Sequence, residues 1–114
     1  MVYIMLTVWV PPEKGRALGK AVLDGVKKFP GDESISKLII QAVTTDDYGI
    51  RAFSISEVLK GQITKALSHT SELAIFYAET IGPGFKYKLE TLMSAIEAMK
   101  VIGLEMPQEA PEIY

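Results

Sequence analysis

Hydrophobic and polar residues alternate along this chain first with the period of a strand and then with the period of a helix. Residues 2–10 switch at every position between an aliphatic set and an aromatic or mixed set, which predicts a β-strand. Two prolines end that segment, and proline is tolerated in the first turn of a helix. A helix is therefore predicted from Pro12 or Glu13 to Phe29, with an apolar stripe at spacings of four, four and three formed by Leu18, Val22, Val26 and Phe29.

The next apolar segments predict a hairpin. Residues 35–45 and 50–56 are rich in β-branched side chains, and they flank the sequence Asp46-Asp47-Tyr48-Gly49, which has the composition of a tight turn. A second helix is predicted from about Glu57 to Ser68, capped by Ser56.

The last third of the chain predicts one more strand and one more helix. Leu73 to Ile81 is predicted as the fourth strand, and Gly82-Pro83-Gly84 ends it. From Phe85 onward the apolar spacing predicts a third helix that ends near Gly103. Residues 1–105 are predicted to form a single domain, and residues 106–114, which contain two prolines, are predicted to form an extended C-terminal tail.

This element order predicts an α+β fold of the ferredoxin-like βαββαβ type, with a four-stranded antiparallel sheet and an added C-terminal helix. Both crossover helices should cover the same face of the sheet. The opposite face would be polar in a monomer, yet both residue sets of the first strand are largely apolar. A partner is therefore expected to cover that face, and the chain is predicted to be a homodimer or a larger oligomer built from dimers.

The chain resembles the dimeric α+β barrel superfamily in element order and in strands that are apolar on both sides, such as 37–43 and 73–78. In that superfamily two ferredoxin-like subunits press their open sheet faces together. The superfamily includes haem-degrading and quinol-forming monooxygenases, lactone isomerases, dye-type peroxidases and ligand-sensing domains. The resemblance therefore implies an architecture and leaves the activity open.

Composition excludes several classes of protein. A formal charge of −2, from 12 basic and 14 acidic side chains, gives no field that would attract nucleic acid. The chain has no cysteine, which excludes disulfides and thiolate sites and fits a reducing cytoplasm. Its apolar segments are too short to span a bilayer. It also has no asparagine and few glutamines, a composition that indicates a thermophilic source.

Motifs with a defined chemistry are few. His69 is the single histidine and is predicted to lie at the frayed end of the second helix, so neither a metal nor a cofactor site is expected. Asp32-Glu33 and Asp46-Asp47 are expected to serve turns. Gly82-Pro83-Gly84 before a helix has the appearance of an anion-binding loop, but no phosphate-binding fingerprint accompanies it, and a plain turn is the better account.

A small-molecule site is predicted along the strands that carry aromatic and charged side chains together. Apolar walls with a few polar groups are the usual composition of such sites. Arg51 is expected to meet a ligand carboxylate, and Glu79 to neutralise it when the site is empty. The candidate ligand-binding residues are Tyr3, Trp9, Arg51, Phe53, Tyr77 and Glu79.

Three functions fit this sequence. The first is a small dimeric protein that binds an apolar or aromatic ligand between sheet and helices. The second is an enzyme of the cofactor-free monooxygenase or isomerase type that the superfamily contains, in which His69 would act. The third is an assembly role, with the third helix and the tail making subunit contacts.

Overall fold

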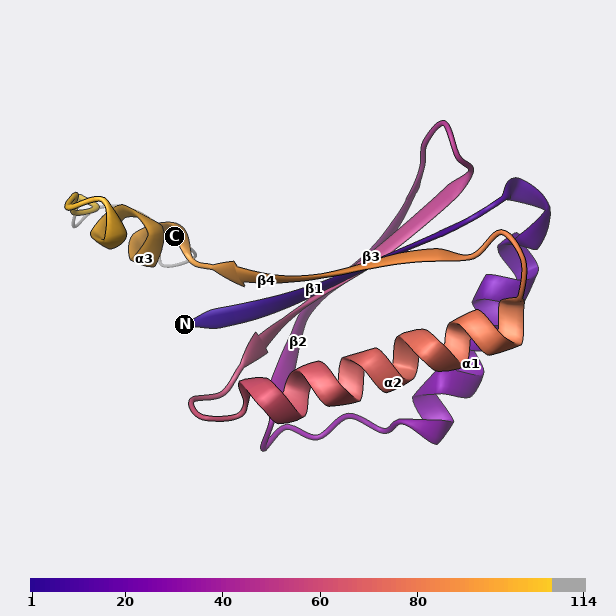
Figure 1. Cartoon of the computed structure of the whole chain (residues 1–114), viewed down its shortest axis with the longest axis horizontal. Coiled ribbons are helices and arrows are strands. Elements are labelled where there is room, and N and C mark those ends of the chain that lie inside the picture. Colours follow the sequence, from indigo (N-terminus) through magenta and orange to yellow (C-terminus); the bar gives the residue numbers. More distant parts are fainter. Residues whose placement is uncertain (108–114) are drawn as a thin grey trace.

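The computed structural model describes residues 1–107 and has one four-stranded antiparallel sheet, in the order β2-β3-β1-β4. The strands are β1 (Val2–Val10), β2 (Ser36–Thr45), β3 (Ile50–Val58) and β4 (Lys86–Met93). The helices are η1 (Pro12–Lys14), α1 (Gly15–Lys28), α2 (Ile63–Ile81) and α3 (Ala95–Val101). Helices α1 and α2 lie on the same side of the sheet (Figure 1). The predicted ferredoxin-like class is confirmed.

Two element assignments in the second half of the chain are wrong. Residues 73–81, predicted as the fourth strand, form the second half of α2, and residues 86–93, predicted as a helix, form β4. The predicted start of the second helix is also wrong, because β3 continues to Val58 and α2 begins at Ile63. The predicted element order is nevertheless correct, because a strand and a short helix do follow α2, at later residues than predicted.

For both wrongly assigned segments the sequence contains a pattern that distinguishes a helix from a strand. The segment from Ile63 to Ile81 contains neither glycine nor proline, and its buried residues recur at helical spacing as Ala66, Ala74, Tyr77 and Ile81. In the segment 86–93, polar and apolar residues alternate over its first five positions, which is the period of a strand. The short apolar run 73–78 fits a strand or a buried helix equally well. The uninterrupted segment around it, Ile63–Ile81, has 19 residues, which is too long for a typical strand and is typical of a helix.

The core lies between β1 and the two helices. Leu6, Val8 and Val10 pack with Leu18 and Ala21 of α1 and with Ala74, Tyr77 and Ile81 of α2. The buried residues of α1 are Leu18, Ala21 and Gly25, so the helix is rotated from the predicted stripe, and Val26 is 66% exposed. Close approach of α2 explains the rotation: a Cβ at Gly25 would lie 3.1 Å from Leu73 Cδ1 and 3.2 Å from Tyr77 Cε1.

Strand β2 is an edge strand that remains exposed on both of its faces. Leu38 and Val43 point to the helix side and are both exposed. A β-bulge between Leu38 and Ile40 places an extra residue, Ile39, on this strand opposite Ile55 of β3. The helix layer is therefore narrower than the sheet, and an open cleft remains beside β2.

Helix α3 extends away from the rest of the molecule as a continuation of β4 (Figure 1). Ser94 caps it by accepting a hydrogen bond from the Glu97 amide at 3.2 Å, and Glu97 pairs with the amino terminus of Met1. The radius of gyration is 15.9 Å, compared with about 13 Å for a compact domain of this length. The C-terminal helix is thus present but short, and the predicted tail beyond residue 107 lies outside the described residues.

Within residues 1–107, no helix is both long enough and apolar enough to cross a bilayer.

Candidate functional site

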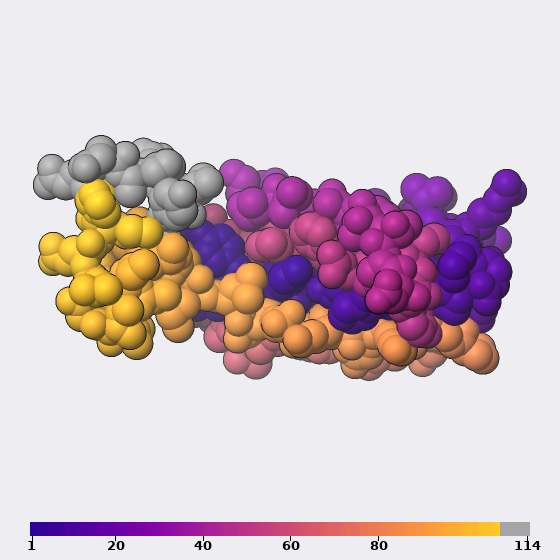
Figure 2. All heavy atoms as spheres, turned by 90° about the horizontal axis from the view of Figure 1, so that it is seen from above, coloured from indigo at the N-terminus to yellow at the C-terminus, as the bar shows by residue number. Residues whose placement is uncertain are grey.

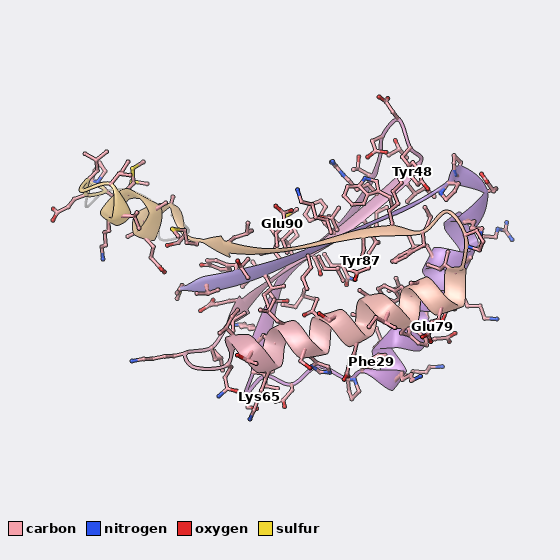
Figure 3. All side chains as sticks on the ribbon, in the orientation of Figure 1. Phe29, Tyr48, Lys65, Glu79, Tyr87 and Glu90 are labelled. Atoms are coloured by element: carbon pink, nitrogen blue, oxygen red, sulfur yellow. The ribbon has the colours of Figure 1, made fainter. Side chains whose placement is uncertain are left out.

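The two faces of the sheet carry different surfaces, and the six predicted ligand-binding residues are divided between them. Tyr3, Trp9, Arg51 and Phe53 lie on the open face, away from the helices. Tyr77 lies on α2 and is buried on the opposite side of the sheet. Glu79 also lies on α2 and is exposed (Figure 3). The predicted pairing of Glu79 with Arg51 is wrong, because residues 73–81 are helical and the sheet separates the two side chains.

The open face consists of four rows of side chains that run across the strands. Antiparallel partners share a face, so the register defines each row. In the order β4, β1, β3, β2 the rows are Lys86-Trp9-Arg51-Thr44, Lys88-Thr7-Phe53-Ala42, Glu90-Met5-Ile55-Ile40 and Leu92-Tyr3-Glu57-Lys37. Figure 2 shows this face, with atoms of β1 visible between those of β4 and of the hairpin.

A shallow depression of about 400 Å³ lies on the open face, and its lining is partly basic and partly apolar. The residues that line it are Met5, Thr7, Trp9, Arg51, Phe53, Lys88 and Glu90. Sequence reasoning missed Lys88 and Glu90, which the alternation in 86–93 places on this face; Figure 3 shows Glu90 on the side away from the helices and Tyr87 on the side toward them. The Nε atom of Arg51 is buried and has no hydrogen-bond partner among the described residues.

Trp9 connects this face to the β2–β3 turn. Its indole Nε1 donates to the Asp46 carboxylate at 2.9 Å, and the same carboxylate accepts from the backbone amides of Tyr48 and Gly49. Partial desolvation alone would raise the pKa of Asp46. The hydrogen bonds from Tyr48, Trp9 and Gly49, with help from the charge of Arg51, outweigh it and lower that pKa below the usual 3.8. Asp46 therefore serves the turn, as predicted.

This hydrogen bond can be followed by fluorescence, because Trp9 is the single tryptophan. Asp46 has a lowered pKa in the fold, so its contribution to stability is present above pH 3.8 and is lost as the pH falls through the folded pKa. We expect Trp9 emission to titrate with a midpoint below 3.8. Asp46→Asn is the control, and it should remove this transition. A midpoint above 3.8, or the same transition in the variant, would contradict the assignment.

The second surface is the cleft between β2–β3 and the helices. Its inner part, about 50 Å³, is bounded by Val8, Val22 and Ala52, with Gln41, Ser54 and Tyr77 as polar groups. Its outer part, about 170 Å³, is lined by Phe29, Gly31, Asp32, Ser36, Leu38, Ser56, His69 and Thr70. Leu73 lines both parts, so the two hollows are neighbours along α2, and together they are called the cleft here.

Tyr77 is the buried polar side chain of the inner part. It is 6% exposed, and burial raises the pKa of its hydroxyl, so this group remains a protonated donor at neutral pH. Phe76 and Phe85 lie at 6.1 Å and 6.5 Å from its ring. The aromatic neighbours of Tyr77 therefore lie behind an inner end whose polar groups are Gln41, Ser54 and Tyr77 itself.

His69 belongs to the outer part of the cleft, and its predicted position at a frayed helix end is wrong. It lies in the first half of α2, and its ring is 6.3 Å from that of Phe29, in an edge-on orientation. Asp32 lines the same space. The side chain and amide of Ser34 donate to Asp32 at 2.5 Å and 2.9 Å and lower its pKa, with smaller contributions from the charges of His69 and Lys65. No local pattern in the sequence indicates this site, because it depends on where β2 and α2 meet.

The remaining sequence candidates do not form sites. Gly82-Pro83-Gly84 precedes a strand, so the arrangement of a loop before a helix that binds anions is not present there. Within the described part of the chain, no three histidine or acidic side chains come together as a metal site would require.

Comparisons with known proteins place the chain by fold alone. No family model matches it, and no curated protein shows significant similarity. A de novo designed protein, Foldit4, superposes with a TM-score of 0.51 and 14% identity over 82% of this chain and 96% of its own. A candidate antibiotic biosynthesis monooxygenase from Caulobacter crescentus CB15 has a TM-score of 0.46 and 19% identity over 80% of this chain and 86% of its own.

Proposed function

We propose that the protein is a homodimer that binds a small aromatic or apolar molecule in the cleft between β2–β3 and the helices. The observation that carries the proposal is the composition of this cleft. It has apolar walls around Leu73, the side chain of Tyr77 at its inner end and the polar side chains of His69, Thr70 and Ser56 at its outer end. In such a site the polar side chains orient a ligand by binding its polar substituent, and the apolar part of the ligand displaces water from the apolar walls.

The size of the cleft favours a single ring. Its outer part of about 170 Å³ is comparable with an apolar cavity of about 150 Å³ that accepts benzene. A phenyl ring there would lie among Phe29, Leu38 and Leu73, and a hydroxyl or carboxylate on it would meet His69 or Thr70. Of the predicted ligand-binding residues, Tyr77 and Phe53 line the inner part of this proposed site. By its place in the register Phe53 also shares the open face with Tyr3, Trp9 and Arg51, and there we propose that a second copy of the chain packs.

An enzyme of the monooxygenase or isomerase type is the second candidate function, and one observation favours it. His69 lines the outer cleft together with Asp32, and an imidazole is the side chain best suited to move a proton near neutral pH. In this alternative, His69 would take a proton from the ligand.

Binding of phenol, benzoate and benzamide tests the proposal. We expect at least one of these compounds to raise the melting temperature and to bind with a Kd of about 1 mM, a realistic affinity for so small a ligand. Leu73→Phe fills the cleft and should weaken binding by about tenfold or more. Ile75→Phe is the matched control, because Ile75 lies on the same helix and is 51% exposed. It should bind as the wild type does.

The outcomes separate the alternatives. Saturable binding that only Leu73→Phe removes, with the compound recovered unchanged in air, supports a binding protein. Conversion of the compound that is lost in His69→Ala would assign the enzyme. The absence of saturable binding, or equal weakening in both phenylalanine variants, would overturn the cleft as a ligand site.

A further inference from the structure

The open face of the sheet has a charged side chain with one buried donor that has no hydrogen bond within the described residues. Arg51 is half-buried, and its Nε has no hydrogen-bond partner within residues 1–107. In that same range the ion pairs are Lys88 with Glu90 at 3.7 Å and the amino terminus with Glu97, so Glu57 of the open face also has no cation. Burying such groups unpaired is unfavourable, and a complementary surface would relieve it.

The charges on this face are ordered along the strands. On β3 the open-face residues run Arg51, Phe53, Ile55, Glu57, which is a cation, two apolar residues and an anion. On β4, Lys86 and Lys88 occupy the two rows at the Arg51 end, and Glu90 begins the other half. The face is therefore positive at one end and apolar in the middle, and its other half carries Glu90 and Glu57, with Lys37 of β2 beside Glu57.

A surface with this order is complementary to itself when it is turned end for end. A two-fold axis in the plane of contact and perpendicular to the strands places the first row on the fourth row of the partner and the second row on the third. Arg51 then meets Glu57 of the partner subunit, Phe53 meets Ile55 of the partner subunit, and Lys88 meets Glu90 of the partner subunit. The strands of the two sheets run along one another, as in aligned sheet packing.

The other two-fold axis, parallel to the strands, is much less favourable. It would place β3 on β1 of the partner and β2 on β4 of the partner. Arg51 would meet Trp9 of the partner subunit, so its guanidinium would be buried without a carboxylate from the partner. Lys88 and Glu90 would meet Ala42 and Ile40 of the partner subunit and would keep only the ion pair that they form with each other within one chain.

The area of the chain also fits an extensive interface. Its accessible surface is 7863 Å², about 1,700 Å² more than the roughly 6,200 Å² typical of a compact monomer of 12.5 kDa, and the protruding α3 contributes to this excess together with the open face. A stable standard interface needs about 800 Å² from each partner. Half-buried Met5, Phe53 and Ile55, with exposed Ile40, supply the apolar centre that such an interface requires.

We infer that two copies of this chain pack their open sheet faces about the axis perpendicular to the strands, held in register by reciprocal Arg51–Glu57 and Lys88–Glu90 pairs. This inference rests on the homodimer of the proposed function and specifies its arrangement. Each pair occurs twice, because the two-fold axis relates the copies.

Charge reversal tests the arrangement by sedimentation equilibrium of the full chain. The wild type should have twice the mass of one chain. Arg51→Glu and Glu57→Arg each place like charges together and should raise the dimer dissociation constant by about a hundredfold or more. The double variant restores opposite charges and should return the constant to within about tenfold of the wild type. Lys65→Glu and Glu79→Arg make the same changes of charge on α2 and should leave it unchanged (Figure 3).

Rescue by the double variant is the result that the other axis cannot produce. A dimer that Arg51→Glu weakens but the double variant does not restore would overturn this arrangement and leave the homodimer itself intact. A monomeric wild type would overturn both. A monomer stabilised by benzoate only while Arg51 is present would instead make the open face a ligand site. Ligand binding in the cleft is measured separately, with Leu73→Phe, so its failure is distinguishable from these results.

Discussion

Replacing Gly49 by alanine is expected to lower the free energy of unfolding by about 3 kcal/mol or more, through both steric overlap and backbone strain. Gly49 closes the β2–β3 turn with a φ of +148°, a conformation that residues with a Cβ rarely adopt. An added Cβ would overlap the backbone carbonyl oxygen of Val10 and lie 2.9 Å from Pro12 Cδ. Val10 is fully buried, so the carbonyl cannot move without disturbing the core.

Gly31→Ala is the matched control for this change. Gly31 has no positive φ, and an added Cβ there would meet no atom within 4 Å, so its effect should be within about 0.5 kcal/mol. Urea unfolding of both variants at one protein concentration measures the difference, since association would otherwise shift the midpoints. Equal midpoints would show that the turn relaxes away from Val10 and Pro12 in the protein.

Replacing Leu6 by alanine is expected to lower the free energy of unfolding by about 2 to 5 kcal/mol. Leu6 lies at the centre of β1, is 5% exposed and packs in the cluster with Leu18, Ala74 and Tyr77. Removal of its side chain takes away buried apolar surface and leaves a cavity that the two helices, each fixed at several other contacts, can fill only in part.

Val43→Ala controls for the loss of methyl groups from the same sheet. Val43 lies on edge strand β2 and is 68% exposed, so the change should cost less than about 1 kcal/mol. Unfolding followed by circular dichroism compares the two. If the two variants were equally stable, the core would not lie between β1 and the helices as described.

The ligand-site prediction shows how an error in local structure spreads to the site. Tyr77 and Glu79 are two residues apart, so a strand would place them on one face. In helix α2 the same separation turns the second side chain by about 200°, which buries Tyr77 and leaves Glu79 in solvent. Trp9, Arg51 and Phe53, on strands that were predicted correctly, do share a face.

The cleft could not have been found by spacing along the chain. Phe29 and Asp32 follow α1, Ser56 lies on β3 and His69 on α2, and they line one space only because the helix layer stops short of β2. Nothing in the local sequence specifies where a helix sits on a sheet, since that position results from many contacts between side chains far apart in sequence.

The sequence by itself determined the strand-helix order, the β2–β3 hairpin, the apolar character of both faces of β1 and the turn role of Asp46, because period and turn chemistry are local properties. Only the tertiary structure decided that residues 73–81 are helical, since a short apolar run satisfies either element until it packs. Tertiary structure also decided the rows of the open face and the cleft beside β2, because strand register and helix placement depend on contacts that no local segment contains.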